Sequence, residues 1–461
     1  MKHFSPLHVL KRSWLPRLLA LAGFLTFGLQ LFLYARTQTT FVDEGTYLYL
    51  GYRFVTGSLS YGELGVWNYY APLSYFIPGL AQFLFGPGLA TGRYFSIACA
   101  LLAASAIWIL ARRLRGEWWA AAALWALALT PLQIKMYTLG LSQALTACLL
   151  SWTFVLVIGE KRSTAQILAG GLLAGLTVMT RHNLAFLLPA LVGYLFWQHG
   201  RRAALLALAA SLLPVLTGLA LFWPSSLRLW TLYWLSQQWF PALSRFDPPL
   251  LTQVNLSLAS RFSAFFLALR AHFLVLSGVV ACLFLWPPQW EKTSHKKTAI
   301  FLAVFFSATL LLHTLILFSQ HLGIFGFVPY VAFFSPAGLL LIILTLPAWD
   351  RRPNPARSIS ILLFLLLLAL APAYLDKIGD RLLALPVPRI SNGIHLGEWS
   401  FLGSYLNHWF DLDYTVLRQV VPPIFFLSAG LLWLLILAGL YTLLKRHNKG
   451  FPLSFAPFTL Q

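Results

Sequence analysis

The chain has 461 residues, of which 59% are hydrophobic and 10% charged, and its mean hydropathy is +0.74. A soluble core cannot bury that much apolar surface, so the composition excludes a soluble globular protein and indicates a polytopic membrane protein. The net charge of +20 does not indicate nucleic-acid binding, because most Lys and Arg lie in short clusters between apolar runs, where they are typical of cytoplasmic connections.

The apolar runs predict an all-α membrane protein with about 12 transmembrane helices and a single domain over residues 1–461. The predicted spans are 15–35, 90–111, 118–136, 139–158, 165–179, 184–198, 203–223, 264–286, 299–318, 327–346, 358–374 and 420–444. Basic clusters occupy alternate connections, so we expect both termini on the cytoplasmic side of a plasma or inner membrane. The first span has no small-residue cleavage site and is expected to stay as a helix.

Three long connections, 37–89, 224–263 and 375–419, are expected on the outer face and to form the active-site face. The stretch from Pro72 to Phe85 is interrupted by Pro78 and Gly79, so we expect it to lie in the membrane interface as a juxtamembrane segment. The three cysteines fall inside apolar runs without the spacing of a disulfide framework or a zinc site.

The first outer connection begins with an adjacent acid pair, Asp43 and Glu44, directly after the first span. A carboxylate at a hydrocarbon boundary costs free energy unless it is paired or used. Repulsion between the two would raise the proton affinity of one, which suits a general base. The alternative is structural, with Asp43 capping a helix from about Gly45 to Thr56 and Glu44 in its first turn.

Cationic side chains are expected on the same outer face, where they could bind a phosphate leaving group. They are Arg53, Arg93, Lys135, Arg181, His182 and His321. Arg181 is the strongest candidate, because it ends an apolar span and lies beside His182 in the turn TRHN. For Arg181, Lys135 and Arg93 the alternative is snorkelling towards lipid headgroups. For His321 it is an ordinary interfacial histidine.

The order of these motifs resembles the C-type glycosyltransferases that use polyprenyl-phosphate sugars, in particular protein O-mannosyltransferases and lipid A aminoarabinose transferases. The residues that carry the resemblance are Asp43-Glu44 with Tyr47 and Gly51 between Gly45 and Gly57, APLSYFIPGLAQFLFG, Arg93, Ala111-Arg112-Arg113, TPLQIKMYTLGLSQAL, GLTVMTRHNLAFLLP and the stretch from Gly326 to Pro336. The likeness covers most of the first 200 residues and is diffuse afterwards.

The resemblance implies that Asp43 is the base for the acceptor, that Glu44 is its partner, and that Arg181 with Lys135 holds the lipid phosphate. The other candidates for substrate binding are Arg93, Arg53, Tyr47, His182 and His321. Many family members have an acid where this chain has Gln143. Because Mg²⁺ and Mn²⁺ favour carboxylate oxygens, we expect no required cofactor and no metal site, and a divalent metal is disfavoured.

The expected reaction is a single inverting displacement, in which an acceptor hydroxyl or amine on a lipid, glycan or protein attacks the anomeric carbon of a polyprenyl-phosphate hexose or pentose. One alternative is a lipid or glycan transporter or flippase, which should carry ionisable residues near the bilayer midplane, whereas mid-span charges are nearly absent here. Another is an oligosaccharide ligase or polymerase, which should depend on Arg and His in a large late loop.

Overall fold

A computed structural model describes residues 14–38, 40, 42–61, 63, 71–223, 226, 279, 290, 292–319, 331–346, 388–390, 394–396, 424, 428 and 431. The chain divides into two compact units, of which unit 1 comprises Met1–Gln253, Gln289–Leu315 and Pro329–Ala348. Unit 1 holds the helices described below, apart from the last residues of α17. The single domain over 1–461 stays a prediction.

The fold is helical, as the sequence predicted. Its helices are α2 (Trp14–Thr37), α3 (Val42–Val55), α4 (Leu73–Phe85), α5 (Leu89–Arg115), α6 (Glu117–Ala128), α7 (Pro131–Thr138), α8 (Ser142–Val157), α9 (Thr164–Thr180), the 3₁₀ turn η2 (His182–Leu184), α10 (Leu187–His199), α11 (Arg201–Leu221), α17 (Thr293–Ser319) and α18 (Val331–Thr345). In unit 2 the strands β1 (Pro388–Ile390) and β2 (Ile394–Leu396) form an antiparallel pair with Arg389 opposite His395.

Three of the described helices, α2, α5 and α11, are long and apolar enough to cross a membrane by length and composition. The predicted span 118–136 is two helices, because Pro131 lacks a backbone N–H and occupies the first turn of α7, so that α6 ends at Ala128. The span 264–286, except for Val279, and the spans 358–374 and 420–444, except for three isolated residues, lie outside the described residues. The count of 12 spans stays a prediction.

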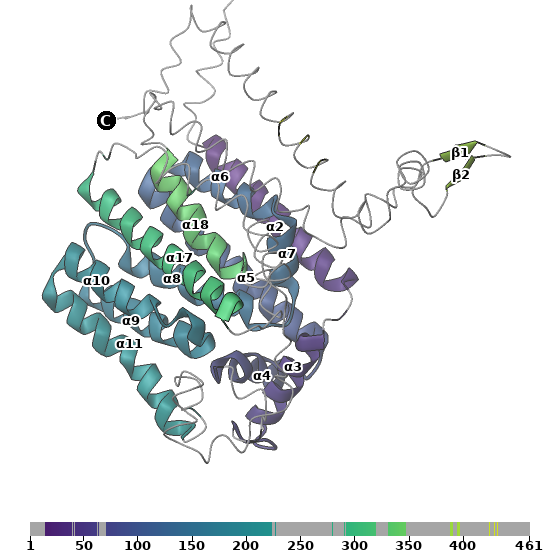
Figure 1. The fold of residues 1–461 in the computed structure, drawn as a ribbon, viewed down its shortest axis with the longest axis horizontal. Coiled ribbons are helices and arrows are strands. Elements are labelled where there is room, and N and C mark those ends of the chain that lie inside the picture. Colours follow the sequence, from purple (N-terminus) through teal and green to yellow (C-terminus); the bar gives the residue numbers. More distant parts are fainter. Residues whose placement is uncertain are drawn as a thin grey trace, which may run out of the picture. The chain divides into compact units, whose positions relative to one another are not determined.

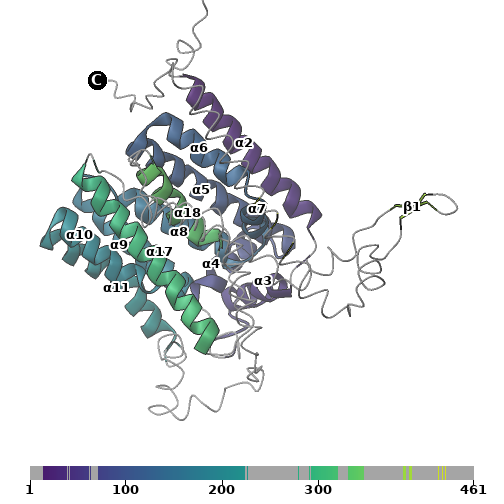
Figure 2. The same ribbon diagram turned by 45° about the horizontal axis from the view of Figure 1, so that its top comes forward.

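Small residues set the spacing between neighbouring helices in unit 1. Helices α9, α10 and α11 lie side by side (Figures 1 and 2). A Cβ atom added at Gly171 of α9 would lie 2.7 Å from the carbonyl oxygen of Ala207 in α11. Glycine therefore allows the two backbones to approach closely, as is common between membrane helices.

One end of unit 1, the basic end, is held together by exposed ion pairs. Glu117 at the start of α6 accepts from Arg17 of α2 at 3.2 Å and from Arg112 of α5 at 2.7 Å. Glu160, between α8 and α9, lies 3.8 Å from the Nζ of Lys292, which precedes α17. Helices α2 and α5 run from here to the opposite end of unit 1, which holds α3 and α4. That the basic end is cytoplasmic stays a prediction.

Candidate active site

The acid pair lies in the first turn of α3, with both side chains near the positive end of the helix dipole. The helix begins at Val42 rather than at about Gly45, so Asp43 lies inside the first turn and is not its N-cap. Successive side chains on a helix diverge by about 100°. As a result Asp43 is partly exposed while Glu44 is 0% exposed.

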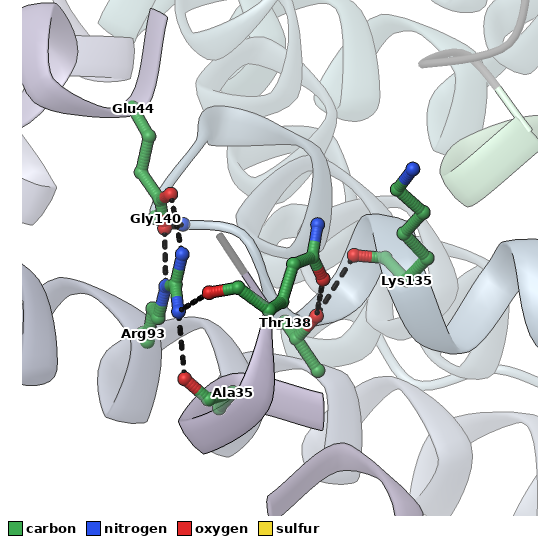
Figure 3. A network of polar contacts seen from close by, with 7 residues as sticks. Ala35, Glu44, Arg93, Lys135, Thr138 and Gly140 are labelled. Carbon is green, nitrogen blue, oxygen red and sulfur yellow. Dashed lines mark hydrogen bonds and ion pairs between the residues drawn. The ribbon is translucent and has the colours of Figure 1, made fainter. Parts of the chain in front are cut away.

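Glu44 is bonded through both of its carboxylate oxygens. Arg93 at the start of α5 donates from Nε to Oε1 at 2.8 Å and from Nη2 to Oε2 at 2.9 Å, and the backbone N–H of Gly140 donates to Oε1 at 2.7 Å. Nη1 of Arg93 donates to the carbonyl oxygens of Ala35 and Gln38, at 2.7 and 2.9 Å. Figure 3 shows Arg93 between Glu44 and Ala35, with Gly140 beside the Glu44 carboxylate. The pair therefore joins the end of α2, the starts of α3 and α5, and the turn before α8.

Gly140 suits this contact because its backbone approaches the side chains of α3 closely. A Cβ atom at position 140 would lie 3.1 Å from Cδ1 of Leu48 and 3.3 Å from Cγ of Glu44. Both distances are shorter than ordinary van der Waals contact. A larger residue would fit only if the side chains of Leu48 and Glu44 shifted by a few tenths of an ångström.

Arg181 brings a second cation to this end of unit 1. It follows α9, is 9% exposed, and donates from Nε to Oγ of Ser142, the first residue of α8, at 3.0 Å. Burial raises the pKa of Asp43 above its ordinary value, and the positive charge of Arg181 lowers it in part. The carboxylate and the guanidinium therefore lie within electrostatic reach of each other.

Repulsion by Glu44, which the sequence predicted as the cause of a raised proton affinity, is not what raises the pKa of Asp43, and that prediction is wrong. Glu44 is neutralised by its ion pair with Arg93, so burial is the main reason that the pKa of Asp43 rises. The two acids have different environments. Glu44 is held inside the fold, and Asp43 is partly exposed.

Two other candidates, Tyr47 and Arg53, lie on the same helix as Asp43. Tyr47, one turn along α3, is 3% exposed and stacks on Tyr75 of α4 with ring centroids 4.8 Å apart. Arg53 lies near the opposite end of α3, about 15 Å further along the axis at 1.5 Å per residue. Its Nη1 donates to the Tyr49 hydroxyl at 3.1 Å and its Nη2 to the carbonyl oxygen of Ser58 at 3.0 Å.

Lys135 is exposed on α7, and in Figure 3 its amine points away from the Glu44 and Arg93 contacts. His182 opens η2 directly after Arg181 and is half-buried. His321 lies outside the described residues. The structure thus brings Asp43, Glu44, Arg93 and Arg181 to one end of unit 1. The roles assigned to these residues stay predictions.

Sequence reasoning missed Ser142 as the partner of Arg181, and Gly140, Ala35 and Gln38 as contacts of the ion pair. Ser142 stands inside the quoted stretch TPLQIKMYTLGLSQAL, so its place beside the second outer turn was the available signal. The other three contribute backbone atoms, which carry no residue-specific signal. Among the described residues no group of three or more His, Cys, Asp or Glu could hold a metal ion.

Residues 70–228 match the family model of dolichyl-phosphate-mannose-protein mannosyltransferases. The solved structure of ArnT from Cupriavidus metallidurans bound to undecaprenyl phosphate is similar at 16% identity and a TM-score of 0.45, covering 93% of this chain and 72% of that one. A search of curated proteins gives no match. The matched stretch contains Arg93, Lys135 and Arg181, and it confirms the resemblance to the C-type glycosyltransferases that the sequence predicted.

Proposed function

We propose that the chain is a membrane glycosyltransferase that moves a hexosyl or pentosyl group from a polyprenyl-phosphate donor to a lipid, glycan or protein acceptor on the non-cytoplasmic face. The observation that supports this most directly is that a partly exposed carboxylate, Asp43, lies within electrostatic range of a buried guanidinium, Arg181. A base and a cation at one place are what transfer from a phosphate leaving group requires.

In this proposal Asp43 accepts the proton of the attacking hydroxyl or amine. Burial raises its pKa, so the carboxylate holds a proton more readily than an ordinary Asp does. A base whose pKa lies closer to the working pH is the more effective catalyst. Asp43 also lies in the first turn of α3, whose main-chain hydrogen bonds fix its position.

Arg181 stabilises the departing polyprenyl phosphate. The hydrogen bond from its Nε to Ser142 fixes the plane of the guanidinium, and a fixed guanidinium suits phosphate oxygens. The acceptor atom bonds to the anomeric carbon as the bond from that carbon to the phosphate oxygen breaks. The electron pair stays on the phosphate, the proton goes to Asp43, and the sugar is inverted. Lys135 adds a second positive charge from α7.

We propose that no metal is required. The donor set supports this, because both oxygens of Glu44 are bonded to Arg93 and Gly140, and Gln143 provides an amide rather than a carboxylate. Hard divalent cations prefer several carboxylate oxygens. Asp43 alone would be a poor site for them.

The test is release of polyprenyl phosphate by the purified protein from a panel of polyprenyl-phosphate sugars, in the presence and absence of acceptor. D43N should lower kcat by about 10²- to 10⁴-fold, because the base is lost, while donor binding is retained. The control is E63Q. Glu63 is exposed and accepts from the backbone N–H of Ser60 at 2.7 Å, so this variant should transfer at the wild-type rate.

Transfer by D43N at the wild-type rate would disprove the assigned mechanism. Movement of labelled polyprenyl phosphate across proteoliposomes without any sugar transfer would instead support a flippase.

A further inference from the structure

Gln143, in the first turn of α8, has a buried side-chain acceptor, its amide oxygen Oε1. The residue is 4% exposed, and its Oε1 has no hydrogen-bond partner among the described residues. A buried carbonyl oxygen without a partner destabilises a fold, and native structures contain few of them. An explanation is therefore needed for this one.

The chain neighbours of Gln143 contact residues of the candidate active site. The preceding residue, Ser142, accepts from Nε of Arg181 at 3.0 Å. Gly140, three residues earlier, donates to Glu44 at 2.7 Å, and Glu44 is the neighbour of Asp43. The segment 140–143 thus contacts Glu44, which is next to the proposed base Asp43, and Arg181, which is proposed to bind the phosphate.

We infer that the amide oxygen of Gln143 accepts a hydrogen bond from a hydroxyl or amine of the bound substrate, and that Gln143 is a specificity-determining residue. The inference rests on the proposed function and names a further contact in its site. A site that is built to bond a substrate hydroxyl rejects an analogue that lacks it, because the acceptor is then left buried and unpaired. Gln143 would therefore select for one polar group on the sugar or on the acceptor.

Helix α8 also provides a matched control. Ser151 is 1% exposed, and its Oγ is likewise without a hydrogen-bond partner among the described residues. It lies eight residues further along, about 12 Å from Gln143 along the axis. S151A removes an unsatisfied group of the same helix away from the site, so it should leave sugar transfer unchanged.

The experiment compares Q143M with the wild type and S151A, because methionine has a similar length and no strong acceptor. Removing an unsatisfied acceptor should raise the unfolding midpoint of Q143M in detergent by about 1 to 3 °C. Q143M should also lower kcat/KM for transfer by about 10- to 100-fold. A residue that only supports the fold would lose stability and activity together.

Deoxy donors identify the source of the hydrogen bond. If the partner is a sugar hydroxyl, the wild type should lose as much activity on the deoxy sugar as Q143M loses on the parent sugar, and Q143M should not distinguish the two. If no deoxy donor has this effect and the KM for acceptor rises in Q143M, the partner belongs to the acceptor.

Q143M that is stabilised but fully active would overturn the inference, and so would Q143M that is destabilised, since Oε1 would then have a partner in the fold. Absence of transfer by the wild type would overturn the proposed function, and this inference with it. Equal transfer by the wild type and Q143M would overturn this inference alone.

Discussion

Glu44 and Arg93 lie 49 residues apart in the sequence and meet in a two-point ion pair, with nitrogen to oxygen distances of 2.8 and 2.9 Å. Their side chains are 0% and 5% exposed. Burying two charges is favourable only where the remaining polar atoms are also bonded, and here Gly140, Ala35 and Gln38 provide those bonds. Because Asp43 precedes Glu44, the ion pair also fixes the position of the proposed base.

Breaking this pair should destabilise the protein strongly. R93A leaves the carboxylate of Glu44 buried without its cation, at a cost of about 3 to 5 kcal/mol. The measurement is thermal unfolding in detergent. The control is R17A, whose side chain is 60% exposed in its pair with Glu117, so that it should change stability by at most about 1 kcal/mol. Equal stability of R93A and R17A would show that the buried pair is not needed.

Exchanging the two residues should not restore stability. In the E44R/R93E double variant the carboxylate would face the carbonyl oxygens of Ala35 and Gln38, and the guanidinium would face the N–H of Gly140. The carboxylate would be repelled by the carbonyl oxygens, and the guanidinium, which only donates hydrogen bonds, would face another donor. The double variant should therefore be no more stable than R93A.

Helices α3 and α4 cross at Gly51 and Gly79, and this crossing should not accept a side chain. A Cβ atom at Gly51 would lie 2.6 Å from the carbonyl oxygen of Tyr75, a backbone atom that cannot rotate away. G51A should lower the free energy of unfolding by about 1 to 3 kcal/mol. Gly45 lies in the same helix with nothing within 4 Å of its Cβ position, so G45A should raise it by about 0.5 to 1 kcal/mol. Chemical or thermal unfolding of both variants checks the contrast, and equal effects would contradict it.

Hydropathy predicted α2, α5, α9 and α11 to within a few residues, because the length of an apolar run sets the length of a helix. It missed the break at Pro131, since the segments on both sides of the proline are apolar.

The sequence also placed Asp43, Glu44 and Arg181 at one end of the helices. Which acid would be buried could not be predicted, because that depends on where α3 begins and on the partner of Glu44, which is 49 residues away. Three further contacts of the pair are made by backbone atoms, which no side-chain pattern indicates.

The acid limb of the pH–rate profile should depend on Arg181. Asp43 must be ionised to accept a proton, so activity falls as the pH drops through its pKa, which burial raises. Arg181 lowers that pKa in part, so R181Q should raise it further and shift the acid limb to higher pH. The profile of kcat/KM against pH measures this. R53Q is the control, because the charge of Arg53 acts on Glu63, and its acid limb should not move. A shift of R181Q to lower pH would contradict the assigned pair.

Lys135 should assist donor binding without stabilising the fold. Its side chain is exposed on α7, and among the described residues its Nζ makes no ion pair. K135A should raise the KM for the polyprenyl-phosphate sugar by about 2- to 5-fold, as expected for one exposed charge, and the effect should shrink at high salt. The unfolding midpoint should stay unchanged. Lys161 is also exposed but lies between α8 and α9 at the basic end, so K161A should leave the KM unaltered. If the two variants give the same KM at low salt, Lys135 does not contact the donor phosphate. Arg181 would then stabilise the leaving phosphate without help from Lys135.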